Sequence, residues 1–369
     1  MALPVDIPAL LSEATNLEEA RKTPLSVSVY IDESAPADLI AHVRKAFASD
    51  HAAVRLTLSY LGDNVASVYP TDDMAVIVAG SSEWVGPSAS AIRNAGVPCM
   101  VCSTQPARVE LIAAAANTPI PDGDLIIPSE SERTIRKNVG KMVARAIPDQ
   151  VNSVKKGLTG LAHAAAITEE EAMADPTPLD AAAAEALNMR MGEWIAVVCR
   201  QKRLAFALAF PFVRKPLALE AVSETSLQNA GVGLVPLIRA ADMPIMTLNQ
   251  AKMTLQIAAA YGNDLTFERA KEILAVVGGA FGCRAVARKA VTFVPALGTV
   301  IGAGVGFAGT EAMGRAVIEY FEGGGNIAGV TRVIEKAATG AGIVYKQTRS
   351  KLIEVRDEVN AQTAAQGQA

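Results

Sequence analysis

The sequence predicts an α/β domain, built on a mostly parallel, doubly wound sheet, followed by a hydrophobic, glycine-rich helical domain. Two observations carry this prediction. Between residues 23 and 150, short apolar and β-branched runs alternate with helix-patterned stretches, as in a parallel sheet covered by helices on both faces. From residue 151 onward the strand pattern disappears, and the apolar residues recur with helical spacing.

The order of elements follows from where these patterns start and stop. Residues 1–22 are predicted to form a helical lead-in that ends before Pro24, and Gly96 marks the end of a later helix. Acid clusters and two prolines in residues 167–180 indicate a linker. The predicted domains are a lead-in at 1–22, an α/β domain at 23–150, a linker at 151–180, a helical domain at 181–355 and a polar tail at 356–369.

Length and composition set the broad class. A chain of 369 residues is long enough for two domains. The formal net charge is -4, so the basic surface that nucleic-acid binding requires is not expected. No secretory signal is visible at the start, and four cysteines do not make a disulfide framework, which predicts a cytoplasmic location.

Polar side chains follow several predicted strands at their carboxyl ends, where parallel sheets bind ligands. They could bind a cation or a small polar ligand, although solvated loop tips have the same composition. Asp72 and Asp73 precede their strand, which places them at the opposite end. The candidate ligand-loop residues are Asp32, Glu33, Ser34, Ser81, Ser82, Glu83, Ser103 and Thr104.

The layout of this domain resembles small GTP-binding domains, and also flavodoxin-like sheets, but the nucleotide motifs are missing. The stretch after the first strand, I-D-E-S-A-P-A-D-L-I, has two acids and neither the glycines nor the lysine of a P-loop. Residues 103–106, Ser-Thr-Gln-Pro, stand where N-K-x-D would read guanine. We therefore expect a degenerate GTPase-like domain with no catalytic residues, no cofactor and no resident metal.

Cys99 and Cys102 form a C-x-x-C pattern, but it falls within V-P-C-M-V-C, which is predicted to be a strand. Residues three apart on a strand point to opposite faces, so one metal ion could not easily bind both thiolates. The pattern is typical of buried thiols.

Residues 304–309, G-V-G-F-A-G, match the dinucleotide fingerprint by letter but lack the preceding strand and the βαβ context. A helical interpretation explains the spacing better, because small residues recur every fourth position and would let another helix approach closely. This predicted helix-packing stripe consists of Gly298, Gly302, Gly306, Thr310 and Gly314.

Four sequence blocks carry a family resemblance over about residues 225–325. They are A-D-M-P-I-M-T-L-N-Q-A-K-M, E-R-A-K-E-I-L-A-V-V-G-G, V-P-A-L-G-T-V-I-G-A-G and G-T-E-A-M-G-R-A-V-I-E-Y-F-E. Together they resemble the bacterial domain-of-unknown-function family 697, the YcjF-like family. The resemblance implies a hydrophobic helical domain that is paired with a GTPase and associated with membranes, and it supplies no catalytic residues.

Two apolar segments raise the question of a membrane. Residues 290–310 carry no charge and are long enough to span, but glycine, Pro295 and the basic residues on both sides argue against a single crossing. Residues 204–213, L-A-F-A-L-A-F-P-F-V, lie between basic flanks and suit either a membrane surface or a buried core helix. Polar residues within the helical domain, Asn229, Asn249, Gln250 and Lys252, are expected to be buried and to link helices.

The sequence therefore predicts a non-catalytic scaffold or partner protein, related to GTPase-linked bacterial proteins, in the cytoplasm or at the cytoplasmic face of the inner membrane. Its expected partners are a protein, either a GTPase or a second copy of the chain, and a membrane surface, but not nucleic acid. The alternative is a switch that responds to a small ligand or nucleotide at the carboxyl ends of the strands.

Overall fold

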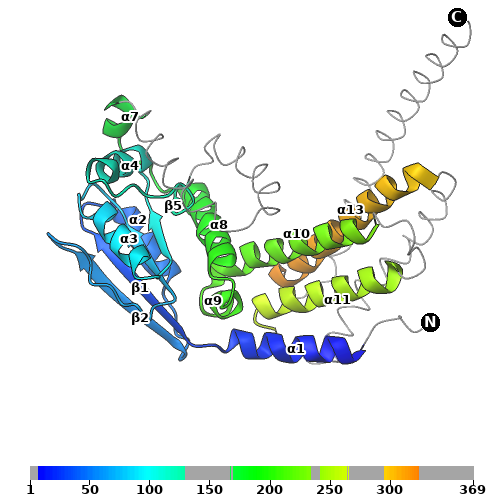
Figure 1. Ribbon diagram of the computed structural model, residues 1–369. Coiled ribbons are helices and arrows are strands. Elements are labelled where there is room, and N and C mark those ends of the chain that lie inside the picture. The colour runs from blue at the N-terminus through cyan, green and yellow to red at the C-terminus, as the bar shows by residue number, and fades with distance from the viewer. Residues whose placement is uncertain are drawn as a thin grey trace, which may run out of the picture. The chain divides into compact units, whose positions relative to one another are not determined.

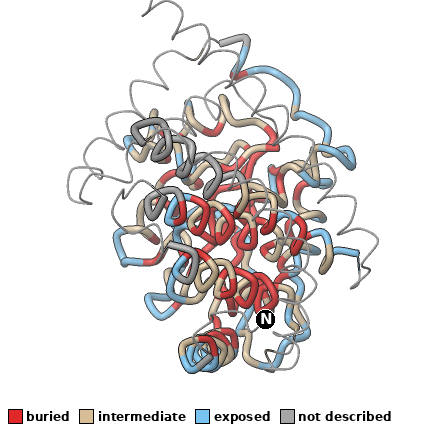
Figure 2. Tube along the Cα trace, turned by 90° about the vertical axis from the view of Figure 1, so that its right-hand side faces the viewer, coloured by how far each residue is buried: buried red, intermediate tan, exposed pale blue. Residues whose placement is uncertain are grey.

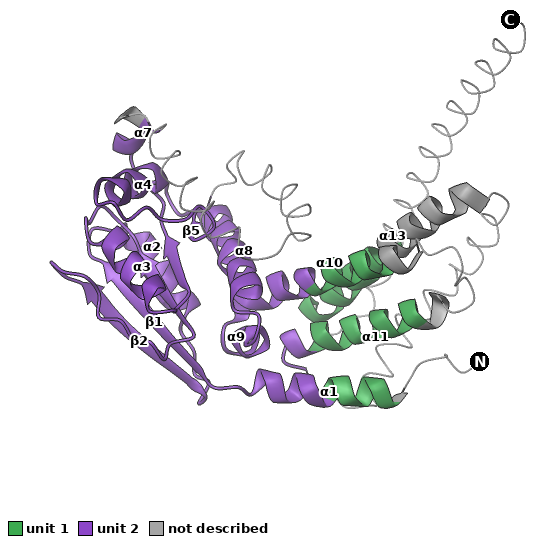
Figure 3. Ribbon diagram, in the orientation of Figure 1, with its two compact units in different colours: residues 1–14, 221–258, 264–369 green, residues 15–220, 259–263 purple. Residues whose placement is uncertain are grey.

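The computed structural model describes residues 7–128, 167, 169–233, 242–263, 265 and 295–323. The chain divides into two compact units (Figure 3). The first, called here the sheet unit, comprises Thr15–Glu220 and Ala259–Asn263. The second, called here the helical unit, comprises Met1–Ala14, Ala221–Ala258 and Asp264–Ala369. The last part of the predicted α/β domain, residues 129–150, and the predicted polar tail lie outside the described residues.

The sheet has five parallel strands in the order β2-β1-β3-β4-β5, which confirms the predicted parallel α/β class. Figure 1 shows the sheet together with helices α2, α3 and α4. The order reverses direction between β1 and β3, because the chain moves from β1 outward to β2 and then returns to the other side. Such a reversal is the topological switch point at which open sheets bind ligands. The strands are β1 Leu25–Asp32, β2 Val54–Leu61, β3 Met74–Val78, β4 Cys99–Cys102 and β5 Leu125–Ile126.

Helices cover both faces of this sheet. Because β1→β2 and β3→β4 run in opposite directions along the sheet, right-handed crossovers place α2 and α3 on opposite faces. The helices wholly within the sheet unit are α2 Ala37–Ala46, α3 Val85–Asn94, α4 Pro106–Ala115, α7 Glu169–Met173, α8 Ala181–Val198 and α9 Arg203–Ala209, with a 3₁₀ turn, η2, at Pro211–Val213.

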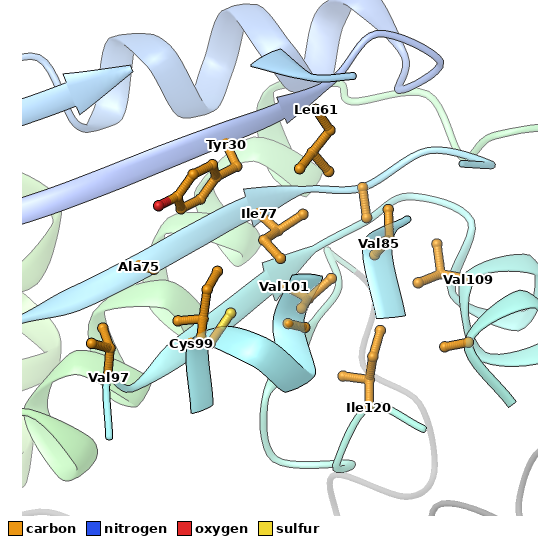
Figure 4. Close-up of a cluster of buried hydrophobic side chains, with 14 residues drawn as sticks. Tyr30, Leu61, Ala75, Ile77, Val85, Val97, Cys99, Val101, Val109 and Ile120 are labelled. Carbon is orange, nitrogen blue, oxygen red and sulfur yellow. The ribbon is translucent and has the colours of Figure 1, made fainter. Parts of the chain in front are cut away.

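One apolar core lies between the sheet and helices α3 and α4 (Figure 4). Tyr30, Ile77 and Val101 lie side by side on β1, β3 and β4, and they pack with Val85 and Val109 from the two helices. The period-2 alternation of the strands places these side chains on a single face. All five residues are at most 2% exposed. Figure 2 shows the buried positions of the chain in red.

Aromatic residues build the core on the other side of the sheet unit. The ring of Phe47, which follows α2, lies edge-on to Phe210 and Phe212 at centroid distances of 5.1 and 5.2 Å. Leu204, Ala205, Phe206, Ala207, Ala209, Phe210 and Val213 are all buried. Of the two interpretations of residues 204–213, this burial supports the core helix.

Helices α10 (Arg214–Gly233), α11 (Asp242–Ala260) and α13 (Pro295–Glu322) supply the described part of the helical unit, together with the start of α1 (Ile7–Arg21). The run G-V-G-F-A-G lies inside α13. A Cβ atom added at Gly314 would come within 2.2 Å of Val222 Cγ2 on α10, so α10 and α13 approach closely there. The packing around Gly298, Gly302 and Gly306 lies outside the described residues.

A chain of side-chain hydrogen bonds joins these three helices. Thr310 Oγ1 of α13 accepts from Asn229 Nδ2 of α10 at 2.9 Å and from Gln250 Nε2 of α11 at 3.0 Å, and Asn249 Nδ2 donates to Asn229 Oδ1 at 2.9 Å. Asn229 and Thr310 are fully buried, whereas Asn249 and Gln250, expected to be buried, have intermediate exposure. In the part of the chain that the structure describes, no helix is both long and apolar enough to cross a membrane.

Candidate functional site

The carboxyl end of β1 holds a buried carboxylate at the switch point of the sheet. Asp32 is 2% exposed. Its Oδ1 accepts from Ser34 N at 2.9 Å and from Ser34 Oγ at 2.7 Å, and its Oδ2 accepts from Gly80 N at 2.8 Å and from Ser82 N at 3.1 Å. A carboxylate has about four acceptor positions, so the loop after β1 and the loop after β3 together use all of them.

These two loops are also in direct contact. A Cβ atom at Gly80 would lie 2.4 Å from Ala35 N and 2.4 Å from the carbonyl carbon of Ser34. Real Cβ atoms cannot approach backbone so closely, which explains why glycine is needed here. Ser81 N donates to Ser34 Oγ at 2.7 Å. The two loops that border the switch point of the sheet are therefore in direct backbone contact.

The structure brings only part of the predicted ligand loop together. Asp32, Ser34 and Ser81 form the contact just described, while Glu33 is exposed and takes no part in it. Ser103 and Thr104 follow β4 and are buried. Ser103 Oγ accepts from Gln105 N at 2.9 Å, whereas the buried Thr104 Oγ1 has no hydrogen-bond partner among the described residues.

An extended segment, residues 174–180, passes over this end of the sheet and was not predicted to contribute to the site. Thr177 N donates to Thr104 O at 3.1 Å, and Leu179 N donates to Asp38 Oδ2 at 3.0 Å. The segment thus connects the end of β4 with the first turn of α2. Its two prolines, which favour extended backbone, were visible in the sequence but gave no indication of its partners.

The amino end of the sheet holds a second set of carboxylates, as predicted from the position of Asp72 and Asp73 before β3. Asp72 Oδ1 accepts from Ser26 Oγ at 2.5 Å and pairs with Arg55 at 2.9 Å, and Ser28 Oγ donates to its Oδ2. Asp73 accepts from Ser26 N at 2.9 Å and pairs with Lys202 Nζ at 2.7 Å. These groups join the starts of β1, β2 and β3 with the loop before α9.

The described thiols are not poised for chemistry. Cys99 and Cys102 lie at the two ends of β4, three residues apart, and both are buried on opposite faces of the strand. Burial raises the pKa of Cys99 and of Cys199 to about 12 and that of Cys102 further, so all three stay protonated at neutral pH. Among the described residues, no group of three or more His, Cys, Asp or Glu side chains could hold a metal ion.

Comparisons of the chain with family models, with curated proteins and with solved structures find no match. The geometry of the site therefore carries the functional argument by itself. At the switch point, the four hydrogen bonds that Asp32 accepts occupy both of its carboxylate oxygens. These hydrogen bonds hold two loops together.

Proposed function

We propose that this protein is a non-catalytic interaction protein, in which a doubly wound sheet serves as a rigid framework and its ligand crevice is closed from within. The observation that supports the proposal is the hydrogen bonding of Asp32. Both of its carboxylate oxygens accept hydrogen bonds from the two loops that border the crevice. A carboxylate in this state has no acceptor position left for a magnesium ion or a ribose hydroxyl. The strand order is the flavodoxin-like one, which supports that half of the predicted resemblance.

Isothermal titration calorimetry tests this proposal. We expect no binding heat when the full chain is titrated with GTP, ATP or flavin mononucleotide, with and without Mg²⁺. Binding with a Kd of about 1 mM or tighter that is lost in Asp32→Ala would overturn it. The neighbouring Glu33→Ala is the matched control, because its exposed carboxylate takes no part in the loop contact.

The helical unit is the proposed docking element of this protein. Its described helices are joined by side-chain hydrogen bonds around the buried Asn229 and Thr310 and by the close contact at Gly314, and it contains the blocks that resemble family 697. The proposed partner is a GTPase or the cytoplasmic face of the inner membrane. Fractionation of a cell lysate followed by an alkaline wash separates the two, because peripheral protein leaves the membrane pellet and a protein-bound chain stays in the first supernatant.

A ligand-responsive switch is a second candidate, and one observation favours it. The buried hydroxyl of Thr104 has no hydrogen-bond partner in the described part of the chain. Residues 174–180 lie beside it, because Thr177 N donates to the backbone carbonyl of Thr104. If that segment were displaced by a ligand, the hydroxyl would gain a partner. Thr177→Pro removes the covering N–H, so a switch predicts that this variant binds a nucleotide that the wild-type chain does not.

A further inference from the structure

Strand β2 forms one edge of the sheet. It pairs with β1 along its whole length, from Leu25 opposite Val54 to Asp32 opposite Leu61, and no described strand pairs with its outer edge. Natural proteins usually protect such an edge with proline, lysine, a bulge or a covering element. In β2, V-R-L-T-L-S-Y-L, there is no proline or lysine, and Arg55 is the single charged residue.

The outward part of β2 is apolar on one face. Leu56, Leu58 and Tyr60 are 38%, 39% and 56% exposed. The parallel register places them beside Val27, Val29 and Ile31 of β1, which are at most 1% exposed. This face of the sheet is therefore buried on β1 and exposed to solvent on β2. The apolar side chains of the face end at the exposed row formed by Leu56, Leu58 and Tyr60.

Arg55 does not interrupt this apolar row. It lies at an alternate position of the strand, and its guanidinium donates to Ser26 Oγ and pairs with Asp72. The charge is thus held on the opposite face. An edge that is long, unpaired and apolar on one face can accept another strand.

We propose that a second copy of this chain pairs with β2 in an antiparallel arrangement, with the twofold axis at Leu58. A symmetric contact requires the strand to be complementary to itself. In this register Leu58 lies opposite Leu58 of the second copy, Leu56 lies opposite Tyr60, and Thr57 lies opposite Ser59. Each pair joins side chains of the same character on the same face.

The charges also favour this register. Arg55 lies opposite Leu61 of the second copy and far from the other Arg55, so no like charges meet. A two-stranded contact between two five-stranded sheets would make one continuous sheet. This proposal names a partner for the interaction role above, but it rests on β2 and not on the closed crevice.

Sedimentation velocity on the full chain, over a range of concentrations up to about 100 μM, measures the association; a dimer with a Kd of about 1 μM would be mostly assembled there. Leu58→Lys places two like charges at the axis, and we expect it to raise the dimer Kd by more than about tenfold. Leu111→Lys on α4 is the control, because Leu111 has a similar exposure of 41% but lies on a helix. A monomeric wild-type chain, or a dimer that Leu58→Lys leaves intact, overturns the proposal.

Cysteine cross-linking tests the register and does not depend on a folding-sensitive variant. At the axis, Leu58→Cys brings two thiols together at a Cα separation of about 4.5 to 5.5 Å, which a disulfide can bridge. We expect rapid oxidation to a covalent dimer for Leu58→Cys and not for Leu111→Cys or the wild-type chain. Cross-linking of Thr57→Cys in its place would overturn the register, and cross-linking of neither would overturn the pairing. Nucleotide binding in the calorimetric test would leave both results unchanged.

Discussion

The two ends of the parallel sheet both hold carboxylates, but they satisfy them in different ways. At the carboxyl end, Asp32 accepts hydrogen bonds from three backbone N–H groups and one hydroxyl, and none of these four donors is a cation. At the amino end, Asp72 and Asp73 pair with Arg55 and Lys202. Asp72 also accepts from the hydroxyls of Ser26 and Ser28, and Asp73 accepts from Ser26 N. One end is held by the backbone of loops, the other by charged side chains.

This difference indicates which end of the sheet is fixed more firmly. Backbone donors on two loops cannot move without changing the loops themselves, and an unsatisfied buried donor costs about 1 to 3 kcal/mol. Side chains such as that of Arg55, which is 56% exposed, can exchange their partner for water at small cost. The carboxyl end, where open parallel sheets bind ligands, is therefore expected to be the more rigid of the two in this protein.

Asp32→Asn should have the largest effect. The amide is isosteric, but it turns an N–H₂ group toward donors such as Gly80 N and Ser82 N and loses two or more of the four hydrogen bonds. We expect a loss of about 3 kcal/mol in the free energy of unfolding. Urea unfolding followed by tryptophan fluorescence measures it, because both tryptophans, Trp84 and Trp194, lie in the sheet unit.

Glu33→Gln makes the same chemical change one residue away, on an exposed side chain, and should alter the stability by less than about 0.5 kcal/mol. If Asp32→Asn were equally mild, the carboxyl end would not depend on its carboxylate. The comparison between the two ends would then have no basis.

Gly80→Ala tests the same end through its backbone. The new methyl group would meet Ala35 N and the carbonyl carbon of Ser34 at 2.4 Å, so the loops must separate, at an expected cost of about 2 kcal/mol. Gly62→Ala has no atom within 4 Å of its added Cβ and is the matched control. The double variant with Asp32→Asn should lose less than the sum, because each change opens the same contact. Strict additivity would contradict a single closed crevice.

Much of this fold could be predicted from the sequence, because the signals are local. Short-range patterns predict the strands and the helices between them. They also predict that Asp72, which precedes its strand, lies at the amino end of the sheet. The strand order could not be predicted, since it depends on which edge each crossover reaches. Nor could the placement of α8 and α9 in the sheet unit, because their alanine-rich apolar pattern fits any helical packing.

The candidate site was located from the sequence, but its role was not. Asp32 was identified because the local run of apolar residues predicts a strand that ends there. Its partners at Gly80 and Ser82 lie 48 and 50 residues further along, and sequence spacing carries no information on such contacts. The cover formed by Thr177 and Leu179 was missed for the same reason, since backbone donors have no sequence signature.

Asp72→Ala examines the amino end and should cost less than Asp32→Asn, about 1.5 kcal/mol. It removes the acceptor of Ser28 Oγ, which is buried, but Ser26 Oγ still accepts from Arg55 and the guanidinium can reach water. The same urea experiment measures it. A loss greater than that of Asp32→Asn would reverse the proposed ranking of the two ends.

Lys202→Ala should have the smallest effect, about 0.5 kcal/mol, because its ion pair with Asp73 joins side chains that are 31% and 19% exposed. The dependence on salt separates it from Asp32→Asn. Raising the ionic strength shortens the screening length from about 30 Å at 0.01 M to about 3 Å at 1 M, so the effect of Lys202→Ala should shrink across that range. The effect of Asp32→Asn should not change, since its donors are backbone N–H groups and a hydroxyl. If both variants responded to salt alike, electrostatic attraction would contribute equally to stability at the two ends. The proposal that backbone hydrogen bonds hold the carboxyl end together would then be wrong.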